Sequence, residues 1–370
     1  MRKILKFLLI SLSLLLAAEL AFVGWTLSPR DREDALPQTT AAPETTVPET
    51  TVPPTTVPTE DYILTFTGDF TPGCMPGQFE NPKAYVGTVG DDYEFPFRYM
   101  RPYFEADDFT FLNLEVVLGL DVGRQANKTF VFSAPEEYVQ IMTTSSVEAV
   151  TLANNHTEDF GQEGYENTKR ILEENDIAYV EEDKTSLFTT ESGLTIGLYA
   201  DSFYLDESEI AENIAALRDQ GAQLVICAFH WGDEGSYRHN KKQEGYAHAA
   251  IDAGADIVVG HHPHVLQEME SYNGGLIFYS LGNFSFGGND HPKDYDSAVI
   301  QQTVMRKSDG TIALGETVIV PICISSVSDR NNYQPVPYEP ESEAYSRVLE
   351  KLNGTYSGPN VIPGYDYLRD

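Results

Sequence analysis

Histidine is the most chemically informative residue type here, because three of the 8 histidines fall within Gly260-His261-His262-Pro263-His264. Neutral imidazole is a common ligand of divalent transition metals. Where the chain leaves a strand, His262 and His264 are two positions apart and can face the same side. The spacing therefore predicts a metal site at this segment. The alternative is a surface turn whose histidines are incidental.

Six short, β-prone apolar runs end in polar residues that could join such a site. They are YILTFTGD (62–69), FTFLNLE (109–115), AVTLANNH (149–156), LVICAFHWGDE (224–234), IVVGHHPHV (257–265) and LIFYSLGNF (276–284). Side chains just beyond the carboxyl ends of parallel strands converge on one crevice in an open α/β sheet. We therefore expect one crevice lined by Asp69, Glu115, Asn155, His156, His230 and the histidines of 261–264.

The residue types suggest roles in this crevice. Asp69 and Glu115 would supply hard carboxylate ligands, although a lone Gly-Asp pair also makes ordinary turns. The Asn155 amide oxygen can bind a metal and the adjacent His156 can protonate a leaving oxygen, unless this segment only caps the next helix. The pattern predicts a metal-dependent hydrolytic site. Its ligands would be Asp69, Glu115, Asn155, His230, His262 and His264, and its catalytic residues His156 and Asn155.

Neighbours of these ligands are expected to contact the substrate. Alternation along the strand puts Asn113 on the same side as Glu115, while His230, read alone, would more often be a buried core histidine. A mixed imidazole and carboxylate set suits Mn, Fe or Zn better than Mg alone, and one or two ions are expected. The expected substrate-binding residues are Asn113, His261, Trp231, Glu234, Ser280 and Asn283.

The elements that must position these residues alternate between strands and helices. Helical periodicity predicts helices over 161–175, 208–220 and 241–253, each between two apolar runs. This alternation predicts an α/β fold with a largely parallel sheet. After residue 296, Ser308-Asp309-Gly310 separates two alternating strands and predicts a hairpin. We therefore expect mixed β-sheets in a sandwich with flanking helices.

Charge and cysteine content restrict the partners and the covalent structure. A net charge of -33, from 57 acidic and 24 basic residues, argues against nucleic-acid binding. An anionic ligand would need local compensation by bound metal and by basic residues such as Arg238, Lys241 and Lys242. The three cysteines are odd in number and widely spaced, so no disulfide framework is expected, not even between Cys74 and Cys323.

The chain divides into four segments by composition. Residues 1–30 join a basic start to an apolar run, which predicts an uncleaved membrane anchor with everything after it outside the cell. A secreted protein after signal cleavage is the alternative. Residues 31–60 repeat proline and threonine and predict an extended, disordered stalk. Residues 61–328 would form the domain, and 329–370 a C-terminal extension packed on it or partly disordered.

Six ordered motifs carry a family resemblance: GDF, NLE, ANNH, HWGDE, GHHPHV and YSLGNF. Across roughly residues 62–325 the chain resembles the CapA (PgsA) family of poly-γ-glutamate capsule biosynthesis proteins. The resemblance implies a calcineurin-like metallophosphoesterase fold. It also implies a membrane-anchored, outward-facing protein that takes part in making or exporting this anionic polymer.

The wider resemblance to metallophosphoesterases implies roles for the same residues. Asp69 resembles the first metal ligand, Glu115 the carboxylate that bridges two metals, and His156 a general acid beside the ligand Asn155. His230, His262 and His264 resemble the later histidine ligands. Two departures put one metal site in doubt: Thr71 stands where the pattern has His, and Glu115 replaces Asp.

Three functions follow as hypotheses. The chain could be a cell-surface factor for poly-γ-glutamate assembly or export that acts with membrane synthase and export proteins. It could instead be an exported metal-dependent phosphoesterase or other hydrolase, or a non-catalytic module that binds this or another surface polymer. Metal content, turnover of a generic aryl phosphate and polymer binding would distinguish them.

Overall fold

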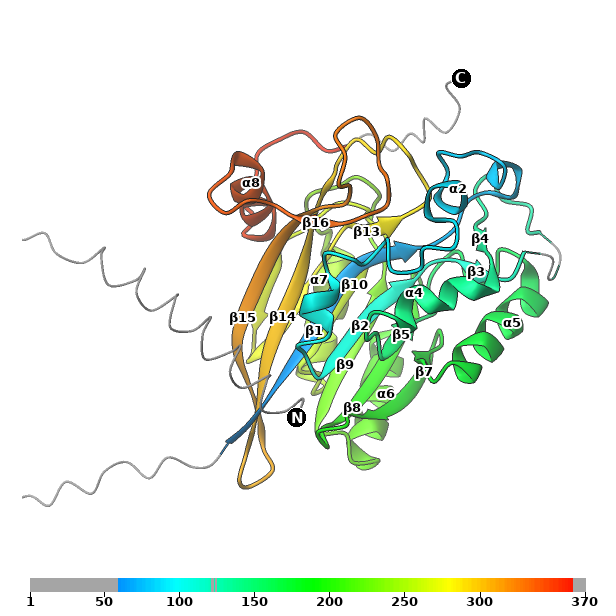
Figure 1. Cartoon of the computed structure of the whole chain (residues 1–370). Coiled ribbons are helices and arrows are strands. Elements are labelled where there is room, and N and C mark those ends of the chain that lie inside the picture. Colours follow the sequence, from blue (N-terminus) through cyan, green and yellow to red (C-terminus); the bar gives the residue numbers. More distant parts are fainter. Residues whose placement is uncertain (1–58, 121–122, 124, 362–370) are drawn as a thin grey trace, which may run out of the picture. The chain divides into compact units, whose positions relative to one another are not determined.

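Two mixed β-sheets face each other in the computed structural model, which describes residues 59–120, 123 and 125–361 (Figure 1). The first sheet has eight strands in the order β16 (Val336–Pro337), β15 (Ile312–Cys323), β14 (Asp296–Lys307), β1 (Thr59–Thr71), β2 (Phe109–Leu114), β5 (Ala149–Thr151) and β6 (Ala178–Val180), with β13 (Asn283–Phe286) paired to β1. The second has six, in the order β11 (Met269–Tyr272), β12 (Gly275–Phe278), β10 (Ile257–His261), β9 (Leu224–His230), β8 (Thr195–Ser202) and β7 (Lys184–Thr189). The expected α/β class with mixed sheets is confirmed.

Parallel pairing at the centre of each sheet brings the predicted site residues to one edge. In the first sheet, β1, β2, β5 and β6 run parallel, and β13 runs parallel to β1. In the second sheet, β8, β9, β10 and β12 run parallel. The polar residues that follow β2, β5, β9 and β10 therefore leave their strands at the carboxyl end, as expected for a ligand site in such a sheet.

The predicted helices and hairpin are confirmed within one or two residues. The helices are α5 (Gly161–Glu174), α6 (Glu207–Asp219) and α7 (Lys241–Asp252). The hairpin joins β14 to β15 through residues 308–311. The other elements are shorter: α2 (Tyr85–Val89), α3 (Arg101–Phe104), α4 (Val139–Thr143), α8 (Glu343–Leu352), the 3-10 turns Pro76–Gln78 and Glu136–Tyr138, and the paired strands β3 (Val117–Leu118) and β4 (Ser133–Ala134).

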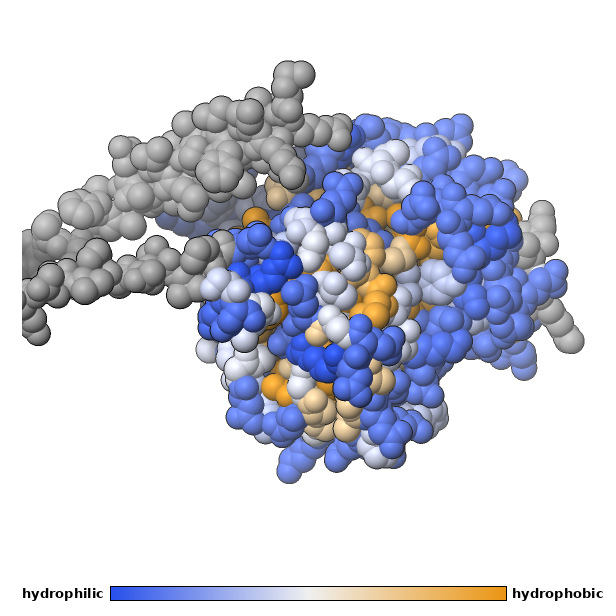
Figure 2. Space-filling model, turned by 90° about the horizontal axis from the view of Figure 1, so that it is seen from below, coloured by the Kyte–Doolittle hydropathy of each residue, from blue (hydrophilic) through white to orange (hydrophobic). Residues whose placement is uncertain are grey.

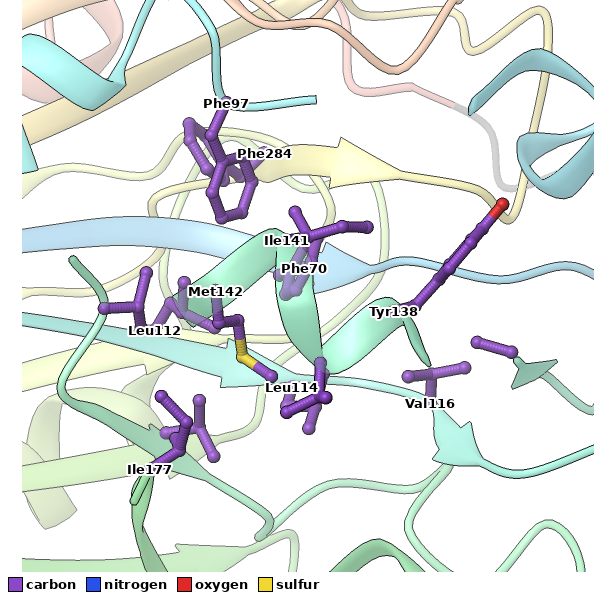
Figure 3. Close-up of a cluster of buried hydrophobic side chains, with 14 of the residues drawn as sticks. Phe70, Phe97, Leu112, Leu114, Val116, Tyr138, Ile141, Met142, Ile177 and Phe284 are labelled. Carbon is purple, nitrogen blue, oxygen red and sulfur yellow. The ribbon is translucent and has the colours of Figure 1, made fainter. Parts of the chain in front are cut away.

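Alternating side chains divide the core into layers, as strand β9 shows most clearly. Leu224 and Ile226 face the core between the sheets, whereas Val225 and Cys227 pack under α6 and α7 on the outer face. On the outer face of the first sheet, Ile141 and Met142 of α4 lie over Phe70, Leu112 and Leu114 of β1 and β2 (Figure 3). The result is a four-layer arrangement, with helices outside both sheets.

Parts of the expected stalk and of the C-terminal extension belong to this domain. β1 begins at Thr59, so the last two residues expected in the stalk belong to a strand. Val348 and Leu352 of α8 join the core between the sheets, so the C-terminal extension packs on the domain where it is described. Within the described ranges no helix is both long and apolar enough to cross a membrane, and the expected anchor lies outside those ranges. All three cysteines are free, as expected.

Candidate metal centre

Asp69 is the buried centre of the site, near the end of β1. Its carboxylate accepts a hydrogen bond from Asn113 Nδ2 at 2.9 Å and lies 3.1 Å from His261 Nδ1. His264 Nδ1 is also 3.1 Å away, at the other carboxylate oxygen. The backbone N–H of His262 donates to the same oxygen at 3.4 Å. Residues from β1, β2 and the segment after β10 therefore meet at one carboxylate, as the strand-end pattern predicts.

A second set gathers around Glu115, which directly follows β2. His230 Nε2 lies 3.6 Å from Glu115 Oε1 and 2.7 Å from the amide oxygen of Asn155. The Thr71 hydroxyl donates to the other Glu115 oxygen at 3.4 Å. Thr71, which replaces an expected histidine, thus supports a carboxylate instead of offering a ring nitrogen. The structure brings all four residues together although they come from four separate segments.

His262 and His264 reach the site through unusual backbone geometry. Both residues have positive φ, 96° and 57°, a region that non-glycine residues rarely adopt. The strand has already ended at His261, so strand alternation does not explain why both rings face the same site. Strain of this kind is tolerated where the surrounding structure holds it in place, and it concentrates at functional sites.

In the described part of the chain, the side-chain atoms that could bind a metal ion form two overlapping groups. One consists of Asp69, Glu115 and His264, and the other of Glu234, His262 and His264. Within each group the atoms that could bind a metal lie within 4.8 Å of one another. His264 is common to both, so the arrangement could hold one or two ions. Glu234, expected to bind substrate, is therefore also within reach of a metal.

Unpartnered polar atoms concentrate at this site. In the described ranges, seven buried side-chain N and O atoms lack a hydrogen-bond partner. Four of them belong to the candidate centre. A buried polar atom without a partner costs free energy, so four in one cluster indicate a missing partner. A divalent cation that accepts imidazole and carboxylate ligands fits this donor set. The four are Glu115 Oε1, His230 Nδ1, His261 Nε2 and His262 Nδ1.

Burial and neighbouring charges shift the pKa values of this cluster in opposite directions. Burial lowers the pKa of His262 to about 3 and that of His230 well below its usual value, so both rings are neutral, as metal ligands must be. Burial opposes the charge of His264, but the carboxylates of Glu115 and Asp69 raise its pKa to about 9. Burial and the nearby Asp69 raise the pKa of Glu115.

His156 is oriented by a partner that the sequence reasoning missed. Its Nδ1 lies 2.6 Å from Asp159 Oδ2, and the buried Asp159 also accepts a bond from the backbone N–H of Phe132 at 2.8 Å. Lys128 pairs with Asp159 at 3.0 Å and donates to the Asn155 carbonyl. The available signal was the i, i+3 spacing of His156 and Asp159. A carboxylate on Nδ1 fixes the tautomer and leaves Nε2 for chemistry.

The expected substrate-binding residues divide into two sets. Asn113, His261 and Asn283 lie in the cluster; Asn283 Oδ1 is 2.9 Å from His264 Nδ1. Trp231 and Ser280 are also buried, but their hydrogen bonds go to backbone carbonyls. Trp231 donates to Tyr279 at 3.0 Å and Ser280 to Val265 at 2.8 Å. These two side chains have supporting contacts in the core, and their role in substrate binding stays a prediction.

Comparison with known proteins adds a family to this geometry. Residues 63–288 match the family described as "Bacterial capsule synthesis protein PGA_cap". The chain is 31% identical to "Capsule biosynthesis protein CapA" of Bacillus anthracis, over 73% of this chain and 69% of that protein. It is 30% identical to "PGA biosynthesis protein CapA" of Bacillus subtilis (strain 168), over 69% and 70% respectively.

The chain is also similar to solved structures, but only distantly. NAD nucleotidase (NadN) of Haemophilus influenzae aligns at 11% identity and a TM-score of 0.40, over 80% of this chain and 63% of that one. Purple acid phosphatase PPD1 from yellow lupin aligns at 11% identity and a TM-score of 0.33, over 70% and 53%. Likenesses of this size carry no argument about chemistry. The sequence matches are much stronger than these structural ones. They show that the chain belongs to the bacterial capsule synthesis protein PGA_cap family.

Proposed function

We propose that this protein takes part in poly-γ-glutamate capsule synthesis or export at the cell surface, with a divalent metal held by the candidate centre. The observation that carries the proposal is that four of the seven buried side-chain atoms without a hydrogen-bond partner in the described ranges belong to residues of the candidate centre, Glu115, His230, His261 and His262. The polymer is inferred from the family and from the names of the two Bacillus relatives. Mn, Fe or Zn suits the ligands best.

The residues around the centre suit an anionic ligand despite the acidic chain. A bound divalent metal would polarise an electrophile or activate a water. Lys128, which is 43% exposed at its side chain, places a cation beside Asn155 and His156. Arg238, which the sequence also offered as a compensating cation, pairs with Glu268 at 3.0 Å. Lys128 is the better candidate for meeting a carboxylate of the polymer.

A second candidate function is hydrolysis by an exported metal-dependent phosphoesterase or related enzyme. The 2.6 Å contact between His156 and Asp159 favours it, because a binding module has no need of an oriented general acid. In this function His156 would protonate the departing oxygen. The Asn155 amide oxygen, 2.7 Å from His230 Nε2, would complete the ligand set.

Placement at the membrane is part of the proposal. The basic start and apolar run of residues 1–30 support a single-pass anchor with the domain outside the cell, and the proline- and threonine-rich segment after it supports a stalk. Secretion after signal cleavage is the alternative. Membrane synthase and export proteins are the expected partners.

Metal analysis of the purified full-length chain tests the proposal. The wild type is expected to carry about one or two equivalents of Mn, Fe or Zn, and His262→Ala/His264→Ala is expected to lose them. The matched control is His248→Ala/His291→Ala, because both of these histidines lie on the surface and pair with acids outside the centre. The control should keep the wild-type metal content.

Other outcomes separate the candidate functions. Turnover of an aryl phosphate by the metal-loaded wild type would favour the hydrolase. Metal and polymer binding without turnover would favour the capsule factor. No metal in any variant after reconstitution would overturn the metal centre and leave a non-catalytic binding role.

A further inference from the structure

We propose that the C-terminal segment 343–361, called here the strap, fixes the loop 232–239, called here the site loop, and so positions Glu234 as a metal ligand. The inference rests on the proposed metal function and deepens it. The strap lies beyond the residues of the chain that match the family, which end at 288. It consists of α8 and the chain that follows it.

The strap is anchored by a buried cation. Lys351 of α8 is almost completely buried and pairs with Asp294 at 2.6 Å and with Asp296 at 2.7 Å. Arg347, one turn earlier, donates to both oxygens of Asp296 at 2.6 and 2.7 Å. Breaking such a pair leaves an uncompensated buried charge, which is strongly destabilising. α8 is therefore fixed to the start of β14, beside the upper ends of β14 and β15 in Figure 1.

The same network continues into the site loop. The Tyr237 hydroxyl donates to Asp294 at 2.8 Å, and the Lys351 ammonium lies 4.7 Å from the Tyr237 ring centre. The backbone N–H of Tyr237 donates to Asn360 Oδ1 at 3.2 Å. Arg238 Nη2 donates to the Tyr356 carbonyl at 2.9 Å. Two consecutive residues of the loop are thus bound to three points along the strap.

Gly235, next to Glu234, is held from both sides. Its N–H donates to the Pro263 carbonyl at 2.8 Å, and its own carbonyl accepts from Val361 N at 2.9 Å. Gly235 has φ 73°, and an added Cβ would stand 2.0 Å from the Val361 carbonyl oxygen. Only glycine allows the strap to lie this close. The site loop is therefore joined on one side to the histidine segment and on the other to the strap.

This double attachment explains how a loop residue can serve the centre. Residues 231–240 form no helix or strand, yet Glu234 lies within ligand reach of His262 and His264. A ligand on irregular chain needs its backbone fixed by surrounding contacts, and outer contacts of this kind typically change metal affinity 10–100-fold. The strap supplies these contacts, so Asn360, Arg238 and Lys351 act as positioning residues.

Calorimetric titration of the full-length metal-free chain with Mn²⁺ tests the proposal. Asn360→Ala and Gly235→Ala are expected to raise the Kd of one Mn²⁺ equivalent about tenfold. Glu234→Gln should do the same by removing the ligand itself. Asn360→Ala and Glu234→Gln both act through the Glu234 carboxylate. The double variant Glu234→Gln/Asn360→Ala should therefore bind Mn²⁺ no more weakly than Glu234→Gln alone. Gly310→Ala is the matched control, since Gly310 has φ 83° but open space around it.

A metal-independent measurement accompanies the titration. Amide hydrogen exchange of residues 236–238 in the metal-free chain should be faster in Asn360→Ala than in the wild type, and unchanged in Gly310→Ala. Wild-type Mn²⁺ affinity in the strap variants, or a further loss in the double variant, would overturn the proposal while the metal centre stands. Unchanged exchange would overturn it regardless of metal. A wild type that binds none of Mn²⁺, Fe²⁺ and Zn²⁺ would instead overturn the proposed metal centre and, with it, the ligand role of Glu234.

Discussion

At the scale of single residues, the site depends on side chains that fix other side chains. Asp159 holds His156 through Nδ1, Asn113 holds Asp69, and Thr71 holds Glu115. Such outer contacts set the orientation of a ligand or a general acid. The His156–Asp159 pair is the most direct structural argument for catalysis, because the buried carboxylate orients the imidazole and fixes its tautomer.

Asp159→Asn should therefore lower the turnover of an aryl phosphate by about a hundredfold while metal content stays at the wild-type level. The amide keeps the size of the side chain but removes the carboxylate that orients the His156 ring through Nδ1. Initial rates and metal analysis of the same preparations provide the measurement.

Glu158→Gln is the control, because Glu158 is the exposed neighbour of the buried Asp159. Equal rates in Asp159→Asn and the wild type would exclude His156 as the general acid. Loss of metal in Asp159→Asn would show instead that the pair supports the ligands.

At the scale of elements, the centre requires a close approach between β1 and the turn before β13. Gly68 directly precedes Asp69, and a Cβ on it would stand 2.1 Å from the Gly282 carbonyl oxygen. Asp69 N–H donates to that same carbonyl at 2.8 Å. The strand that carries the central carboxylate is therefore in direct backbone contact with the segment that carries Asn283.

Gly68→Ala is expected to lower the free energy of unfolding by about 1–3 kcal/mol, because the added methyl group meets backbone atoms that must shift. It should also reduce metal content, since the shift moves Asp69. Gly245→Ala, in α7 with open space around it, should raise stability by about 0.5–1 kcal/mol. Urea unfolding of both variants measures the difference, and a neutral Gly68→Ala would mean that the two segments can separate freely.

At the scale of the whole molecule, the chain is strongly acidic, and a few of its acidic residues are buried. Figure 2 shows one face as largely hydrophilic around a band of hydrophobic residues, in keeping with a net charge of -33. Just before β2, burial and the charge of Glu148 raise the pKa of Asp107 to about 8. Burial likewise raises the pKa of Glu148 to about 7. Both groups hold protons that the unfolded chain releases near pH 4.

Stability should therefore fall as pH rises from 6 to 8, because the folded chain binds more protons than the unfolded chain in this window. The slope is up to about 1.4 kcal/mol per pH unit for each proton. Asp107→Asn should reduce it, whereas Asp61→Asn, at an exposed residue, should not. Urea unfolding at pH 6, 7 and 8 measures the slope, and identical slopes in all three proteins would contradict the assignment.

The sequence by itself determined the class of fold, the three long helices, the hairpin and most of the residues that gather at the candidate centre. These follow from local patterns: apolar periodicity defines each element, and a polar residue just past an apolar run marks the end of a strand. Asp69, Glu115, His262 and His264 could be found this way because each lies within three residues of the end of a strand. The family could be recognised from the order of six such ends.

Only the tertiary structure decided which neighbours face the centre and what holds them there. Trp231 and Ser280 turn into the core because backbone carbonyls of Tyr279 and Val265 accept their donors. His262 and His264 face the site through positive φ, which no periodicity predicts. The buried Lys351 anchor joins residues more than 50 positions apart. Such contacts depend on how distant segments pack, and the local sequence carries no signal for them.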